Sequence, residues 1–188
     1  MDDQEIPRGI TTMEGPPVTV HFDGACQPPS GPGIATYGFT VEGPGLWHEE
    51  SGLAVPPFSE HATNNVAEYT GAISALDWLR RHGYRGPVVV VGDSELVIRQ
   101  MRGEYAVRAE HLRAYHDWLG RLGREFASVE WRSVPREENR RADELSKEAL
   151  VEARSTARRL RPSSPPDPEE KSGDAREDPG DDQPQRTV

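Results

Sequence analysis

Four acidic residues stand where a single fold could gather their side chains into one site. Each lies on or beside a different predicted helix or strand, at Asp23, Glu68, Asp93 and Asp143. Carboxylates brought together without a basic partner repel one another unless a cation neutralises them. Magnesium suits such a site, because it binds carboxylate oxygens together with water and phosphate oxygens, and two ions can stabilise both oxygens of a displacement at phosphorus. The four acids therefore predict phosphoryl chemistry with divalent cations.

The strands that would position these acids are predicted from apolar patterning. Val18, Val20 and Phe22 alternate with polar residues, as in a half-buried strand. Asp23 therefore falls on the polar side of this strand. Further strands are predicted at about 34–41, 46–54, 88–91 and 129–134. The second and third follow a Gly/Pro turn pattern typical of antiparallel pairs, whereas the unbroken valine run of the fourth suits a central strand covered on both faces.

Helices are predicted between these strands, at about 63–82, 94–101, 109–126 and from near 139 past 153. Thr63 and Ser94 are suitable N-caps, and Gly83 suits a helix C-terminus. The order βββ-α-β-α-α-β-α implies an α/β fold with a five-stranded mixed sheet, three antiparallel strands and then parallel strands, flanked by helices. If the first and fourth strands are neighbours, Asp23 and Asp93 meet at one edge of the sheet.

Charge and composition indicate where the folded part lies. The net charge is −10, yet residues 1–16 carry four acids and one base, and residues 162–188 carry eight acids and three bases. Both ends lack apolar periodicity, which predicts disordered segments at 1–16 and 161–188 around one domain at 17–160. Because that domain is nearly neutral, the overall acidity does not exclude a nucleic-acid ligand.

The sequence carries no signal for export or membrane insertion. Its single cysteine, Cys26, excludes an intrachain disulfide, and no leader or long apolar span is recognisable. We expect a cytoplasmic protein with no membrane partner, acting as a monomer.

The four acids lie in recognisable sequence segments. These read FDGACQ around Asp23, TNNVAEYTGAISAL around Glu68, VVVGDSELVIRQMRG around Asp93 and NRRADELSKEA around Asp143. Over about residues 17–153 the chain resembles type 1 ribonucleases H. The resemblance implies the ribonuclease H-like fold and hydrolysis of the RNA strand of RNA–DNA hybrids, by a two-metal-ion mechanism that gives 5′-phosphate and 3′-hydroxyl ends. It implies two Mg²⁺ ions, which Mn²⁺ could replace, and an RNA–DNA hybrid as partner.

The resemblance also implies roles for single residues. It makes the four acids catalytic metal ligands, and Glu68 would also touch the ribose 2′-hydroxyl. Asn64 and Asn65 would read the minor groove, where the 2′-hydroxyl distinguishes RNA from DNA. Thr63 would contact a phosphate of the DNA strand. Further substrate contacts are implied for Gln100 and Asn139.

The chain departs from the family pattern at three places. Many members carry a histidine in the loop before the last helix, where this chain has VPREEN. We assign the work of that histidine to Arg136, whose guanidinium could hold the scissile phosphate or the departing 5′-phosphate. Val66 stands where many members have an arginine. The basic protrusion of some members is missing, since only GEYAVRAEH separates two helices, and this resembles the compact, archaeal-like branch.

Other interpretations stay open. Each acid could be an ordinary solvated carboxylate, and Asn64 and Asn65 could simply belong to the first turn of a helix. The fold could also serve as a non-catalytic nucleic-acid-binding module, against which the presence of all four acids argues. A third alternative is a nuclease that acts on double-stranded RNA or structured DNA.

Overall fold

The computed structural model describes residues 16–29 and 32–160. The predicted disordered segments, 1–16 and 161–188, lie outside the described residues except for residue 16. None of the helices in the described part of the chain has the length and hydropathy needed to span a membrane.

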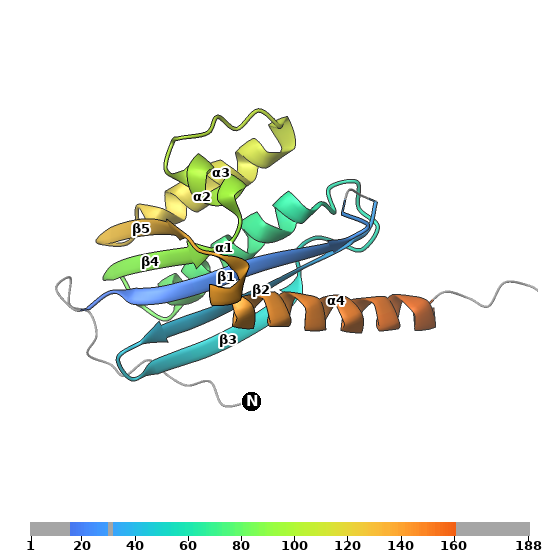
Figure 1. Ribbon diagram of the computed structural model, residues 1–188, viewed down its shortest axis with the longest axis horizontal. Coiled ribbons are helices and arrows are strands. Elements are labelled where there is room, and N and C mark those ends of the chain that lie inside the picture. Colours follow the sequence, from blue (N-terminus) through green and yellow to red (C-terminus); the bar gives the residue numbers. More distant parts are fainter. Residues whose placement is uncertain (1–15, 30–31, 161–188) are drawn as a thin grey trace, which may run out of the picture.

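The centre of the molecule is a five-stranded mixed sheet (Figure 1). Its strands are β1 (Val18–Gln27), β2 (Ile34–Gly43), β3 (Leu46–Leu53), β4 (Pro87–Gly92) and β5 (Ser128–Ser133). They lie in the order β3-β2-β1-β4-β5; β1 is antiparallel to β2 and parallel to β4, and β5 is parallel to β4. The predicted fold is therefore confirmed, including the pairing of the first and fourth strands.

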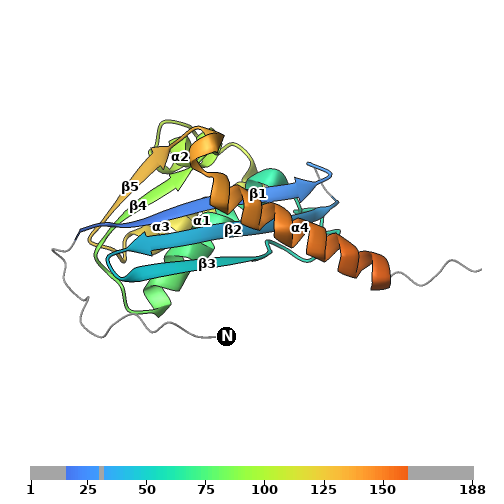
Figure 2. The same ribbon diagram turned by 60° about the horizontal axis from the view of Figure 1, so that its bottom comes forward.

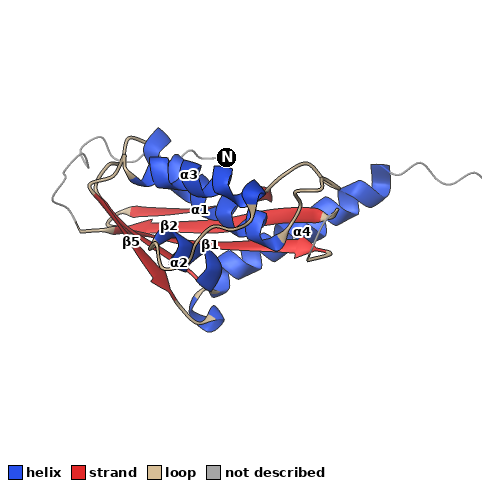
Figure 3. Cartoon of the chain, turned by 90° about the horizontal axis from the view of Figure 1, so that it is seen from above, coloured by secondary structure: helices blue, strands red, loops and turns tan. Residues whose placement is uncertain are grey.

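Helices cover both faces of this sheet. They are α1 (Asn64–Arg81), α2 (Glu95–Met101), α3 (Glu110–Gly123) and α4 (Arg140–Leu160), with a 3₁₀ turn, η1, at Arg136–Glu138. The helices α1, α2 and α3 gather on one side (Figures 1 and 3), whereas α4 lies alone across the other face, over β1, β2 and β3 (Figure 2).

The apolar pattern of the sequence explains this layering. Val20 and Phe22 of β1 are fully buried and pack in one core with α1, so the alternate residues of β1, including Asp23, face α4. All four valines of β4 are buried, as a central strand covered on both faces requires. Strand β1 continues beyond Asp23 and stays paired with β2 as far as Gln27.

The helix ends follow the predicted capping. The Thr63 hydroxyl accepts a hydrogen bond from the Val66 N–H at 3.3 Å, and Ser94 accepts one from the Val97 N–H at 3.4 Å. Gly83, beyond the end of α1, has a φ of +81°, a conformation in which a side chain would be strained. Each cap lies near a predicted site acid, since Glu68 is in the first turns of α1 and Asp93 directly precedes Ser94.

Candidate active site

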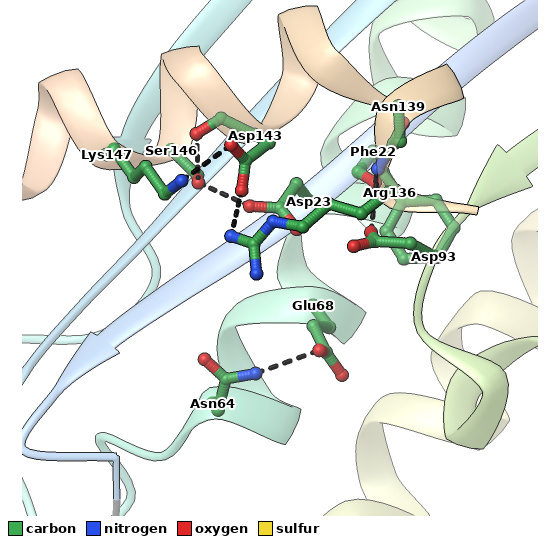
Figure 4. A network of polar contacts seen from close by, with 10 residues as sticks. All are labelled: Phe22, Asp23, Asn64, Glu68, Asp93, Arg136, Asn139, Asp143, Ser146 and Lys147. Carbon is green, nitrogen blue, oxygen red and sulfur yellow. Dashed lines mark hydrogen bonds and ion pairs between the residues drawn. The ribbon is translucent and has the colours of Figure 1, made fainter. Parts of the chain in front are cut away.

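The four predicted acids come from separate parts of the fold and lie around one region at the edge of the sheet; in Figure 4 Asp23, Asp93 and Asp143 lie near Arg136, whereas the Glu68 carboxylate is turned toward Asn64. Asp23 lies within β1, and Asp93 directly follows β4. The parallel register pairs His21 with Val91, and continuing it by two residues brings Asp93 opposite Asp23. Glu68 enters from α1 and Asp143 from the first turn of α4.

Two glycines let the helices approach the sheet closely enough to bring these acids together. A Cβ on Gly24 would overlap the backbone N of Glu68 and would lie 2.5 Å from the carbonyl carbon of Ala67. A Cβ on Gly38 of β2 would lie 2.6 Å from the backbone N of Ser146 in α4. The absence of side chains at these two positions therefore places Glu68 and the start of α4 against β1.

Glu68 is held by two neutral donors. The Ser94 hydroxyl donates to Glu68 Oε2 at 2.6 Å, and Asn64 Nδ2 donates to Glu68 Oε1 at 2.8 Å. Ser94 thus caps α2 and also orients a carboxylate on α1. These contacts fix the Glu68 side chain without neutralising its charge.

Asp23 and Asp93 are also held by neutral donors. The Ser146 hydroxyl of α4 donates a short hydrogen bond to Asp23 Oδ2. Asn139, which is 1% exposed, donates through Nδ2 to Asp93 Oδ1 at 2.8 Å and to the carbonyl oxygen of Phe22 at 2.9 Å. Asn139 therefore ties the end of β4 to β1 just before α4 begins.

The environment favours the protonated forms of two of these acids. Burial, together with the nearby charges of Asp93 and Asp143, raises the pKa of Asp23 to about 6 against the opposing hydrogen bond from Ser146. Burial likewise raises the pKa of Glu68 to about 7, with Asp23 and Asp93 adding to the effect. The acids therefore repel one another across a shared, poorly solvated site.

Asp143 differs from the other three acids because it has basic partners. Arg136 of η1 forms a short ion pair with Asp143 Oδ1, and Lys147 Nζ lies 2.7 Å from Asp143 Oδ2. Burial acts to raise the pKa of Asp143, but the hydrogen bonds from Lys147 and Arg136 outweigh it and lower this pKa. The expectation of a carboxylate cluster without a basic partner is therefore wrong at Asp143.

The donor set suits a hard divalent cation, although the side chains are not closed around one. Carboxylate oxygens are the ligands that Mg²⁺ and Mn²⁺ prefer. The raised pKa values of Asp23 and Glu68 reflect burial first and the neighbouring negative charges second. Within residues 16–29 and 32–160, no group of three or more His, Cys, Asp or Glu side chains is arranged to hold a metal ion. Asp143, engaged by two cations, is the acid most removed from such an arrangement.

The predicted substrate-contacting residues fall into two groups. Thr63, Asn64 and Asn65 lie at the partly exposed N-terminus of α1, next to Glu68. Gln100 is buried and accepts a hydrogen bond from the Tyr69 hydroxyl at 2.7 Å, and Asn139 is engaged as described above. Contacts of these two with substrate stay predictions, and they would require the internal hydrogen bonds to open.

Comparisons with known proteins agree with this geometry. A family model described as reverse transcriptase-like matches residues 50–149. A bifunctional protein of Mycobacterium tuberculosis is 32% identical over 143 residues, which are 74% of this chain and 37% of that protein. The ribonuclease HI of Halobacterium salinarum is 34% identical over 152 residues, covering 78% of this chain and 73% of the relative. The chain belongs to the type 1 ribonuclease H family.

Solved structures of type 1 ribonucleases H have the same fold. The N-terminal ribonuclease H domain of the mycobacterial protein aligns with a TM-score of 0.66 at 31% identity, covering 74% of this chain and 97% of that one. The Halobacterium salinarum enzyme aligns with a TM-score of 0.64 at 32% identity, covering 73% and 99%. A ribonuclease H1 from compost, solved with an RNA/DNA hybrid, aligns with a TM-score of 0.63 at 33% identity, covering 72% and 98%.

Within the type 1 ribonuclease H family, this chain has the predicted compact form. A short connection, residues 102–109, joins α2 to α3, so no basic protrusion is inserted there. Sequence reasoning did not identify Ser146 and Lys147 as parts of the site. Their signal was their spacing, since residues three and four positions after Asp143 share its face of the helix.

Proposed function

We propose that this chain is a metal-dependent endoribonuclease that hydrolyses the RNA strand of RNA–DNA hybrids and leaves 5′-phosphate and 3′-hydroxyl ends. The observation that supports this most directly is the convergence of four carboxylates from four elements on one partly buried site. The chain spans 37% of the length of the mycobacterial relatives, so the proposal concerns the activity of this domain.

Asp23, Glu68, Asp93 and Asp143 would hold two divalent ions, Mg²⁺ or Mn²⁺. Bound there, the ions would supply charge stabilisation to a displacement at phosphorus. The protein's own contribution is orientation: Ser146 holds Asp23, and Asn139 holds Asp93. Preorganised acids of this kind reduce the reorganisation needed when the phosphate arrives.

Substrate choice would come from the N-terminus of α1. Asn64 lies there beside Glu68, and amide side chains can hydrogen-bond to 2′-hydroxyls in the wide minor groove of a hybrid. The related compost enzyme was solved in complex with an RNA/DNA hybrid, which supports the same ligand for this chain. Arg136, with a side chain 61% exposed, can reach a phosphate from the opposite side of the site.

Cleavage of an end-labelled RNA–DNA hybrid with Mg²⁺ tests the proposal. We expect wild-type protein to cut the RNA strand and Asp93→Asn to lose at least about a hundredfold in rate, because the carboxylate charge that holds the cation is removed. Asp117→Asn, a matched change at an exposed residue of α3, should keep wild-type activity.

The same assay separates the alternatives. If the chain is a non-catalytic binding module, wild type and Asp93→Asn should bind the hybrid equally well, and neither protein should cut it. A nuclease for double-stranded RNA or structured DNA would cut those duplexes faster than the hybrid. Equal cleavage of the hybrid by wild type and Asp93→Asn would overturn the assignment of the four acids.

A further inference from the structure

The four carboxylates of the site are held in two different ways. Asp23, Glu68 and Asp93 accept hydrogen bonds from neutral hydroxyl and amide groups. Asp143 instead has both oxygens engaged by cations, Oδ1 by Arg136 and Oδ2 by Lys147. The site is therefore electrostatically asymmetric, with its own positive charges concentrated at one end.

The two cations reach Asp143 from different elements and with different freedom. Lys147 is one turn further along α4, so it shares a helix face with Asp143. Arg136 reaches across from η1, and its side chain runs past Asp23 toward Asp143 (Figure 4). The Arg136 side chain is 61% exposed, whereas that of Asp143 is 10% exposed, so Arg136 covers the carboxylate from the solvent side.

A divalent cation that uses an Asp143 oxygen must share that oxygen with one of these ion pairs or displace it. It would also lie close to a guanidinium that interacts with Asp23 and Asp93 as well as Asp143. Like charges at such a separation repel, and the repulsion is strongest where the surroundings are poorly solvated. Arg136 and the ion therefore compete for the oxygens of Asp143 that face the site.

We propose that Arg136 and Lys147 are resident counter-cations that compete with divalent metal for Asp143. The position that uses Asp143 is thereby the weaker of the two cation positions, and it fills as Arg136 moves away. A phosphate at the site would draw the guanidinium off Asp143, so substrate and the weaker ion would bind cooperatively. This inference rests on the proposed function only in taking the four acids as metal ligands.

Calorimetric titration of the metal-free protein with Mn²⁺, without nucleic acid, tests the competition. Removing a partly exposed ion-pair partner changes binding modestly, so Arg136→Gln and Lys147→Gln should each tighten the weaker ion by roughly two- to fivefold. Arg136→Lys keeps the charge and should stay nearer to wild type. Arg81→Gln, at the far end of α1 and paired with Asp77, removes the same charge and should change nothing.

A double-mutant cycle makes the test specific to Asp143. In an Asp143→Asn background, Arg136→Gln should no longer tighten Mn²⁺, because the carboxylate for which the two cations compete is gone. A gain that persists in this background, or a gain no larger than that of Arg81→Gln, would overturn the proposal. So would the absence of Mn²⁺ binding in every variant.

The cleavage assay keeps this result separate from the proposed function. If Arg136→Gln binds Mn²⁺ more tightly than wild type, while the wild-type protein does not cut hybrids, the competition is supported and the nuclease is refuted. If the wild-type protein cuts hybrids but Arg136→Gln leaves its Mn²⁺ affinity unchanged, the nuclease is supported and the competition is refuted. Circular dichroism should show an unchanged fold, since Arg136 is largely exposed on a 3₁₀ turn.

Discussion

Asp23 is buried beside two other carboxylates, and Ser146 is its hydrogen-bonding partner on α4. A charged group in such a place lowers the stability of the metal-free protein, because water is partly removed and no full positive charge contacts it. The arrangement is useful to a metal site, since a cation relieves both penalties at once. In the proposed metal site, the lower stability of the metal-free protein would accompany a higher affinity for divalent metal.

The raised pKa of Asp23 predicts how stability depends on pH. The folded protein holds this proton up to about pH 6, whereas the ordinary value is 3.8, so the stabilising contribution is present below about pH 4 and is lost as pH rises through 6. Asp23→Asn removes the charge and keeps an acceptor for Ser146. We expect it to stabilise the metal-free protein by about 1–3 kcal/mol at pH 8 and by roughly half as much at pH 5, where part of the penalty is already present.

Urea unfolding in the presence of a chelator, at pH 5 and pH 8, measures this difference. Glu152→Gln, at an exposed residue of α4 more than two turns after Asp143, is the control and should show no such change between the two pH values. Glu68, with a pKa raised to about 7, adds to the pH dependence of wild type in the same direction. If Asp23→Asn is no more stable than wild type at pH 8, the charged Asp23 carboxylate does not destabilise the metal-free protein.

At the scale of elements, the site depends on how closely α4 approaches β2. Gly38 permits this approach, since a Cβ there would lie 2.6 Å from both Leu145 Cβ and Ser146 N and 2.7 Å from the carbonyl oxygen of Ala142. Backbone atoms cannot move aside as a flexible side chain can. Helix α4, and with it Asp143 and Ser146, must therefore shift when any side chain is placed at this position.

Gly38→Ala should consequently damage both stability and activity. We expect a loss of about 1–3 kcal/mol in urea unfolding, as for other overpacked sites. We also expect more than about tenfold slower hybrid cleavage, because small displacements of catalytic groups are costly. Gly52→Ala on β3 is the control, since its Cβ would approach the end of the Tyr37 side chain, 3.2 Å from the hydroxyl. Wild-type cleavage by a folded Gly38→Ala protein would show that the close approach is not needed.

Element order was predictable from the sequence because each strand and helix carries a clear local signal. The alternation before Asp23, the valine run before Asp93 and the caps at Thr63 and Ser94 need no tertiary information. The pairing of Asp143 with Arg136 was not predictable, because it depends on where η1 turns before α4. Asn139 was assigned to the substrate from its motif, while its buried bonds to Asp93 and Phe22 depend on strands more than 40 residues away in sequence.

At the scale of the whole molecule, charge is unevenly distributed. Residues 162–188 carry eight acids and three bases, a net charge of −5 out of −10 for the chain. The domain has no basic protrusion between α2 and α3, so phosphate contacts must come from helix N-termini and from separate arginines such as Arg136. Hybrid binding is therefore expected to be weak and sensitive to salt.

A chain that ends at Arg161 tests whether this acidic segment opposes the ligand. Removing net negative charge reduces repulsion of the phosphates, so the shortened chain should bind a hybrid roughly two- to fivefold more tightly at about 50 mM salt, and the difference should vanish near about 500 mM. Fluorescence anisotropy in the Asp93→Asn background, where we expect cleavage to be lost, measures binding at the two salt concentrations. A variant of the 188-residue chain with the eight acids changed to Asn or Gln should bind like the shortened chain, because charge rather than length is the cause. A gain that survives at high salt, or that the neutralised variant lacks, would mean that the segment acts by occupying the site instead of by repulsion.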